Sequence, residues 1–306
     1  MKILVTGGAG FIGSHLVDAY LARGDEVAIL DNFSTGKREN LNPKATLFEI
    51  NLEDEDAVTK AVSDFQPELI NHQAAHAAIA DSKAHPQGNA NANIMGSLNL
   101  FEAARKAGVK RIVAASSSAV YGDATEIPTK ETTPTEPVSP YGISKRTMEL
   151  YFHYYQVEYG LAYVALRYAN VYGPRQSTTF FPVVANLTTK LLNHQPIQLG
   201  GDGTQTRDLV FVADVVAANL AAGENGSGAY NVSTNRETSM NDLLKLIASE
   251  VGESAVLTFN PKNVGVLRSA LDNSKAAAEL QWQPKTSLED GIKQTVSWYK
   301  TFLSKE

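Results

Sequence analysis

Cysteine is absent from this sequence. The absence excludes a disulfide framework, a thiolate nucleophile and a cysteine-ligated zinc site. A chain without cysteine suits a reducing compartment, and we expect the protein in the cytoplasm.

Long apolar runs and an excess of basic charge are also missing. No stretch of about 18 apolar residues occurs, so no membrane-spanning helix is expected, and the apolar run 3–5 is too short for the core of a signal peptide. Lys and Arg number 27 against 33 Asp and Glu, a formal net charge of −6. This balance argues against nucleic acid or anionic lipid as a partner. With 306 residues, 43% of them hydrophobic, the chain has the composition of a globular protein of about two domains.

The first half of the chain alternates between short apolar runs and stretches of helical periodicity. The apolar runs predict strands at 3–5, 27–30, 47–50, 69–70, 112–114 and 163–166. The intervening periodicity predicts helices that end at Gly24, cover 54–64 and 90–107, and run from Pro140 to Gly160. Such alternation predicts an α/β protein with a Rossmann-type, doubly wound parallel sheet covered on both faces.

The regular alternation of strands and helices ends near residue 168, where prolines, glycines and polar stretches become frequent. We expect the first domain to cover 1–168, with about 207–237 crossing back to it. A smaller, interleaved C-terminal α/β domain then covers 169–206 and 238–306, with helices at roughly 239–251 and 288–303.

A glycine-rich loop lies between the first strand and the first helix. Gly8, Gly10 and Gly13 satisfy G-x-G-x-x-G, a spacing that lets a pyrophosphate approach backbone N–H groups at a helix N-terminus. Asp31 ends the second strand, where a carboxylate binds the adenosine ribose hydroxyls and repels a 2′-phosphate. The pattern predicts NAD as the cofactor, although the nearby basic pair 37–38 keeps NADP open.

A serine, a tyrosine and a lysine form a second constellation. Ser117 follows the fifth strand, and residues beyond the carboxyl ends of parallel strands face the ligand crevice. Tyr141 and Lys145 are four apart, which places them on one helix face. A nearby ammonium favours a phenolate, so we expect the pKa of Tyr141 to fall below its usual value of about 10. Such a tyrosine accepts the proton of a sugar hydroxyl while the serine hydrogen-bonds the same oxygen.

Together, the loop 7–13, the Ser117 segment and Tyr141-x-x-x-Lys145 resemble the extended short-chain dehydrogenase/reductase superfamily. Within it, the chain resembles the NAD-dependent nucleotide-sugar epimerase/dehydratase family, and there most of all the UDP-glucose 4-epimerases. The resemblance covers nearly the whole chain, through segments 31–38, 166–175, 201–208, 230–232 and 280–284. It implies that the first domain binds NAD and the second binds a nucleotide sugar.

The resemblance also implies roles for individual residues. Ser117, Tyr141 and Lys145 would be catalytic. Residues implied at the cofactor are Gly7, Gly10, Phe11, Ile12, Gly13, Asp31, Asn32, Ser34, Thr35, Gly36, Asn51, Leu52, Gln73, Ala74, Ala75, His76, Asn93, Tyr141 and Lys145. Residues implied at the substrate are Ser117, Tyr141, Asn170, Arg207 and Lys262. No metal site is expected, because His72 and His76 lack a nearby acidic partner.

The implied reaction is epimerisation at C4 of the sugar, through transient oxidation to a 4-keto intermediate and return of the hydride. Relatives that eliminate water carry an Asp-Glu pair where this chain has Ser118-Ala119, so dehydration is disfavoured. Departures from the epimerase pattern at Gly200 and 262–265 leave the sugar and the nucleotide open. A 4-keto-sugar reductase, an epimerase of another nucleotide sugar and a non-catalytic NAD-sensing regulator stay as alternatives. A homodimer through the Tyr141 helix and the helix before it is also implied.

Overall fold

The computed structural model describes residues 1–179, 182–254, 256–260 and 266–304. Its centre is a seven-stranded sheet in the order β11-β6-β5-β4-β1-β2-β3, with every neighbouring pair parallel. The strands are β1 (Lys2–Thr6), β2 (Glu26–Asp31), β3 (Thr46–Glu49), β4 (Leu69–His72), β5 (Arg111–Ser117), β6 (Ala162–Tyr168) and β11 (Gly228–Val232). The order reverses between β1 and β4, which is the switch point of a Rossmann sheet. The predicted fold class is confirmed.

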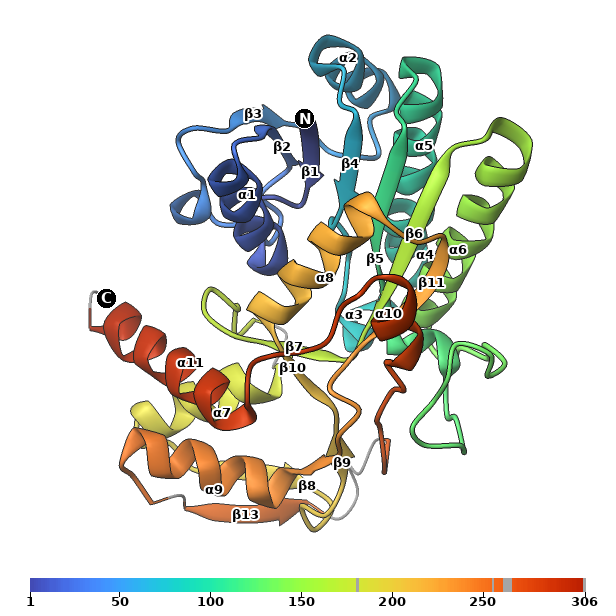
Figure 1. Cartoon of the computed structure of the whole chain (residues 1–306). Helices are drawn as coiled ribbons and strands as arrows, with labels where there is room; N and C mark the ends of the chain where they lie inside the picture. The colour runs from blue at the N-terminus through green and yellow to red at the C-terminus, as the bar shows by residue number, and fades with distance from the viewer. Residues whose placement is uncertain (180–181, 255, 261–265, 305–306) are drawn as a thin grey trace.

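Helices cover both faces of this sheet (Figure 1). On one face lie α1 (Phe11–Arg23) and α8 (Val212–Glu224), and on the other α2 (Glu55–Phe65), α5 (Gly96–Ala107) and α6 (Pro140–Tyr159). Along β1, Ile3 and Val5 join the core beneath α1 and α8, whereas Leu4 joins the opposite core. Strand side chains alternate between faces, so a strand buried on both sides is apolar over most of its length.

The predicted helix 90–107 begins earlier than expected. It starts with α4 (Pro86–Ala90), continues through the π turn η2 (Asn91–Met95) and then becomes α5. Pro86 occupies the first turn of α4, where a missing N–H costs nothing. The predicted start at residue 90 is therefore wrong by about one turn.

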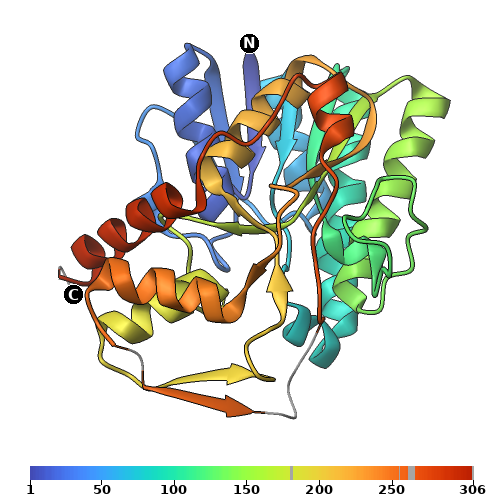
Figure 2. The same ribbon diagram turned by 60° about the horizontal axis from the view of Figure 1, so that its bottom comes forward.

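The remaining elements form a second layer of structure at the carboxyl edge of the sheet (Figure 2). Three two-stranded pairs join β7 (Asn170–Tyr172) to β10 (Leu209–Phe211), β8 (Ile197–Gly200) to β13 (Leu257–Asn260), and β9 (Thr206–Arg207) to β12 (Thr238–Ser239). Helices α7 (Val183–Leu192), α9 (Met240–Val251) and α11 (Leu288–Leu303) share one apolar core with the β7–β10 and β8–β13 pairs. The short elements are η1 (Arg38–Asn40), α3 (Ile79–Ala84), η3 (Ser118–Tyr121) and α10 (Ser274–Glu279).

Strand β11 lies inside the segment 207–237 that was predicted to cross back, and it pairs with β6 at the sheet edge. The division of the chain into two domains stays a prediction. Within the described ranges, no helix is long and apolar enough to cross a membrane.

Candidate active site

The loop between β1 and α1 leaves no room for side chains at two of its glycines. Gly7 has a φ of +67°, and a Cβ there would lie 2.8 Å from the Ala74 nitrogen. A Cβ on Gly13 would lie 2.1 Å from the Gly7 carbonyl oxygen. No side chain caps α1 at Gly10. The first N–H groups of α1 therefore face the loop with the positive end of the helix dipole, a suitable arrangement for a pyrophosphate.

The Asp31 carboxylate is held in place at the carboxyl end of β2. Its Oδ2 accepts a 2.9 Å hydrogen bond from the Ala9 N–H, and its Oδ1 accepts one of 2.8 Å from the Phe33 N–H. A Cβ on Gly36 would lie 2.9 Å from the same carboxylate. The carboxylate thus fits the ribose of a dinucleotide, and it also stabilises the glycine loop.

A cavity of about 270 Å³ runs along the carboxyl ends of the central strands. Its lining contains most of the residues expected at the cofactor. These are Gly7, Gly10, Phe11, Ile12, Gly13, Asp31, Asn32, Ser34, Thr35, Asn51, Leu52, Gln73, Ala74, Ala75, His76, Tyr141 and Lys145. The glycine cradle, the Asp31 carboxylate and this cavity together fit a dinucleotide such as NAD.

Three expected residues are not part of the lining. Gly36 packs against Asp31. Asn93 accepts a 2.8 Å hydrogen bond from the His76 N–H and donates to the His76 carbonyl at 3.1 Å, so it supports the lining and does not form it. Ser117 accepts a 3.2 Å hydrogen bond from the Ala119 N–H, at the start of η3.

Sequence reasoning missed eight lining residues: Leu30, Ile50, Glu53, Ala77, Ala92, Ala115, Ser116 and Tyr168. Several end strands or follow them directly, as Tyr168 does at the end of β6. The rule that strand ends face the crevice could have found those residues. Glu53 and Ala92 carry no comparable signal, because only folding brings their segments to the cavity.

Helix α6 starts close to η3, which brings Tyr141 toward Ser117. Ser139 caps the helix by accepting a 3.1 Å hydrogen bond from the Gly142 N–H. A Cβ on Gly142 would lie 2.5 Å from the Ala119 carbonyl oxygen, so glycine permits this close approach. The Lys145 Nζ lies 6.0 Å from the centre of the Tyr141 ring.

Burial dominates the protonation of both side chains. It lowers the pKa of Lys145 to about 8, against the opposing effect of the Glu149 carboxylate. It raises the pKa of Tyr141, against a lowering hydrogen bond with Ser117. The expected fall in the pKa of Tyr141 is therefore wrong for this structure. The phenolate loses more stabilisation by leaving water than its polar neighbours return.

Of the five expected substrate residues, Asn170 and Arg207 lie near each other, outside the cavity lining. The Asn170 N–H donates a 3.0 Å hydrogen bond to the Asp208 carbonyl, next to Arg207. Arg207 donates from Nη1 to the carbonyls of Thr206 and Val266, at 2.7 and 2.8 Å. Within the part of the chain that the structure describes, no carboxylate pairs with this guanidinium. Lys262 lies outside the described residues.

The two histidines have different surroundings. His72 is buried, with Nδ1 2.7 Å from the Thr6 hydroxyl and Nε2 2.9 Å from the Ser97 hydroxyl. Burial lowers its pKa to about 3, so it is a neutral structural side chain. His76 lines the cavity. Among the described residues, no group of three His, Asp or Glu side chains could hold a metal ion.

Comparison with known proteins agrees with this geometry. The family model of the NAD dependent epimerase/dehydratase family matches residues 3–233. UDP-glucose 4-epimerase of Mycolicibacterium smegmatis is 41% identical over 310 residues, which cover 98% of this chain and 99% of the relative. The chain therefore belongs to the NAD-dependent epimerase/dehydratase family, which confirms the predicted family and the predicted cofactor.

Two crystal structures of other proteins are similar to this chain over nearly its whole length. UDP-glucose 4-epimerase of Thermotoga maritima with UDP-glucose has a TM-score of 0.97 and 44% identity, covering 99% of this chain and 100% of that one. UDP-glucose 4-epimerase of Thermus thermophilus in complex with NAD has a TM-score of 0.94 and 40% identity, covering 98% and 99%. Both similarities support the predicted enzyme class, a nucleotide-sugar epimerase.

Proposed function

We propose that this protein is an NAD-dependent UDP-glucose 4-epimerase. The observation that carries the proposal is the placement of Tyr141 and Lys145 in the wall of a cavity built for a dinucleotide. The names of full-length relatives at about 40% identity support the sugar and the nucleotide.

The cofactor site is made from three parts of the chain. The N–H groups at the start of α1 bind the pyrophosphate, and Asp31 accepts hydrogen bonds from the adenosine ribose. The segment 73–76 lines the cavity between the loop and Tyr141. NAD held by these residues would supply reversible hydride transfer at C4 of the sugar.

The proton chemistry belongs to Tyr141. Its phenolate oxygen accepts the proton of the C4 hydroxyl and later returns it, while Ser117 hydrogen-bonds the reacting oxygen. Burial raises the pKa of Tyr141, so the phenolate depends on its neighbours. Lys145 provides a cation close by, with its Nζ 6.0 Å from the ring centre. Its ammonium stabilises the phenolate and holds the tyrosine ready as a base.

The substrate's diphosphate is assigned to Arg207 and Asn170. Arg207 donates only from Nη1 within the described residues, which leaves its other N–H groups for phosphate oxygens. In this proposal 1–168 and about 207–237 form the NAD-binding domain. Segments 169–206 and 238–306 form the substrate-binding domain, and the cytoplasm is the site of action.

An exposed apolar stripe on α6 supports a homodimer. Ile143, Leu150, Tyr154 and Val157 recur at helical spacing, and Val157 is 71% exposed. Tyr151 and Tyr159 extend the stripe. Exposed apolar side chains in a row are typical of a helix that packs against a second copy.

Mass spectrometry of the purified protein, followed by a panel of UDP-, dTDP- and GDP-sugars, tests the proposal. We expect retained NAD and interconversion of the C4 epimers of a UDP-hexose without net consumption of reductant. Stoichiometric oxidation of NADH or NADPH by a 4-keto sugar would favour the reductase instead. Binding of NAD without turnover of any sugar would favour the regulator.

A further inference from the structure

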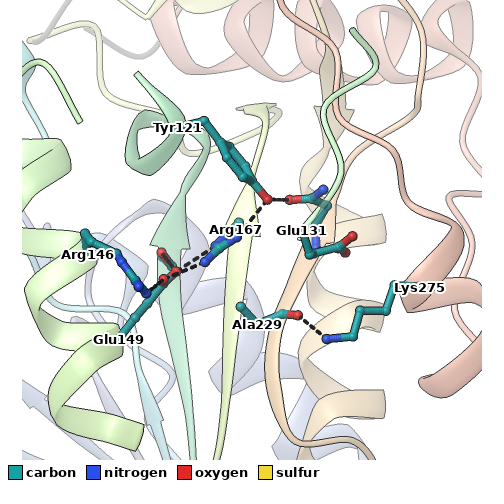
Figure 3. Close-up of polar contacts among 9 residues, drawn as sticks. Tyr121, Glu131, Arg146, Glu149, Arg167, Ala229 and Lys275 are labelled. Carbon is teal, nitrogen blue, oxygen red and sulfur yellow. Dashed lines mark hydrogen bonds and ion pairs between the residues drawn. The ribbon is translucent and has the colours of Figure 1, made fainter. Parts of the chain in front are cut away.

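Glu149 is a buried carboxylate one turn beyond Lys145 on α6, and it is only 3% exposed. It accepts four hydrogen bonds (Figure 3). Arg167 donates two of them, from Nε at 2.9 Å and from Nη2 at 2.7 Å. The Ser116 hydroxyl donates at 2.7 Å and Arg146 Nη1 at 3.1 Å. Every lone pair that the carboxylate offers in its plane is therefore engaged.

The donors tie α6 to the strand end that carries Ser117. Ser116, bonded to Glu149, lies directly between Ser117 and Ala115, and the Ala115 carbonyl accepts the hydrogen bond from Lys145 Nζ. Helix α6 is thus fixed to β5 at two points, one turn apart. A shift of the helix along the strand would break both contacts together.

Arg167, on β6, connects the Glu149 carboxylate to the edge of the sheet. Its Nη1 donates to the Tyr121 hydroxyl at 2.9 Å, and that hydroxyl donates to Asn231 Oδ1 at 2.7 Å. Asn231 lies on β11, and its N–H donates to Glu131 Oε1 at 2.8 Å. The network therefore reaches from α6 through β6 and η3 to β11, at the edge of the sheet (Figure 3).

We propose that Glu149, held by Arg167, is a positioning residue for the reaction: it fixes α6 against β5 and places a negative charge one turn behind the Lys145 ammonium. This inference rests on the proposed function. Glu149 touches neither the cavity nor the Tyr141 hydroxyl, so it acts through Lys145.

The protonation states of Glu149 and Lys145 agree with this positioning role. Burial works to raise the pKa of Glu149, but hydrogen bonds and charge from Arg167 outweigh it and hold that pKa below its usual value. The carboxylate is therefore ionised at neutral pH, and it raises the pKa of Lys145 against burial. The other titratable or charged groups around this pair are Arg146, Arg167, Tyr121, Tyr163, Tyr141 and His72.

Glu149→Gln tests the inference, because it keeps the shape and removes the charge. We expect kcat to fall at least tenfold, and the alkaline limb of the kcat profile to move to lower pH by about one unit. NAD retention should be unchanged. Glu149→Asp, which restores the charge, should return the alkaline limb without full recovery of kcat. A pH profile of Glu149→Gln that superposes on that of the unmodified protein would overturn the inference.

Glu102→Gln is the matched control. Glu102 also accepts a hydrogen bond from α6, from the Tyr155 hydroxyl at 2.6 Å, and it also pairs with an arginine, Arg105. Among the described residues its carboxylate accepts hydrogen bonds from Arg105 and Tyr155, neither of which is on β5, so this variant should leave the pH profile unchanged. If Glu149→Gln fails to fold because Arg167 is left unpaired, the double variant with Arg167→Gln removes both charges. The same alkaline shift is expected there, and its absence contradicts the inference.

A second readout separates this inference from the proposed function. In NAD-loaded protein with isotope-labelled lysine, the Lys145 signal, assigned by its loss in Lys145→Met, reports the protonation of that side chain directly. We expect Lys145 to titrate at lower pH in Glu149→Gln, whether or not a sugar is converted. An unchanged titration would contradict the role of Glu149 even if epimerase activity is found.

Discussion

Lys145 Nζ donates a 2.7 Å hydrogen bond to the Ala115 carbonyl oxygen, and this bond joins the helix that carries Tyr141 to the strand end that carries Ser117. The side chain is only 3% exposed, so its ammonium is stabilised by the protein and not by water. The bond orients Lys145 beneath the cavity, and the cost of burying the charge explains its lowered pKa.

Removal of the Tyr141 hydroxyl tests the role of this residue as the catalytic base. In Tyr141→Phe, we expect turnover to fall by about 10²–10⁴ because the variant lacks the phenol that takes the C4 proton in this proposal. The phenol is not needed for cofactor binding, so NAD should still be retained. Turnover of a UDP-sugar and NAD content by mass spectrometry are the two measurements. Undiminished turnover would show that Tyr141 is not the base.

Replacement of the buried Lys145 ammonium by an apolar side chain should raise the free energy of unfolding and abolish turnover. Below pH 8, Lys145 is protonated in both states, and the cost of its burial is fully present. Between about 8 and its ordinary pKa of 10.5, the unfolded chain binds a proton that the folded chain does not, so stability rises with pH. Lys145→Met should therefore stabilise the protein at pH 7, by up to about 3 kcal/mol less the lost hydrogen bond, while turnover collapses.

Urea unfolding at pH 7 and pH 10 measures this difference. The gain in unfolding free energy should shrink as the pH rises toward the ordinary pKa of lysine. A gain of equal size at both pH values would mean that packing, and not charge, is responsible.

Helix α6 lies so close to η3 at Gly142 that a methyl group added at this residue should not fit. In Gly142→Ala the new Cβ would lie 2.5 Å from the Ala119 carbonyl oxygen, so the start of α6 must move and carry Tyr141 with it. We expect kcat to fall about tenfold or more. Gly88→Ala is the control, because a Cβ on this α4 residue meets nothing within 4 Å. It should leave kcat unchanged, and equal effects in both variants would refute the steric account.

Asp31 should select between the two nicotinamide cofactors. Asp31→Asn keeps the side-chain shape, removes the charge that repels a 2′-phosphate and weakens the bonds to Ala9 and Phe33. We expect NAD to bind about tenfold more weakly and the ratio of Kd values for NADP and NAD to fall. Asp64→Asn, on the exposed face of α2, controls for net charge. An unchanged ratio of Kd values would show that Asp31 does not discriminate.

A charge on the exposed stripe of α6 should separate the proposed dimer. Val157→Asp places a carboxylate where an apolar side chain is 71% exposed. Light scattering after gel filtration should give a dimer for the unmodified protein and a monomer for the variant. A monomer in both cases would contradict the dimer, and a dimer in both would place the interface elsewhere.

Most of the fold could be predicted because its signals are local. Strands buried on both faces are mostly apolar, and three predicted helix ends coincide with glycines of positive φ, at Gly24, Gly108 and Gly160. The start of α4 was missed because a short helix and a π turn have no periodicity of their own.

The site likewise contains features that the sequence signals locally and features that only the folded structure reveals. The glycine loop and the Tyr141–Lys145 pair are contiguous in sequence and could be found by spacing. The Glu149–Arg167 pair joins residues 18 apart in sequence, on two different elements, and no spacing rule signals it. The direction of the Tyr141 pKa was predicted wrongly because sequence shows the neighbouring ammonium but not how deeply the phenol is buried.

Incubation of the purified protein with UDP-galactose, with its retained cofactor and no added reductant, tests the central proposal most directly. The account predicts that UDP-glucose forms until the two sugars reach equilibrium, with no net accumulation of NADH. Failure to convert UDP-galactose or any other sugar of the panel, in protein shown to contain NAD, would contradict it.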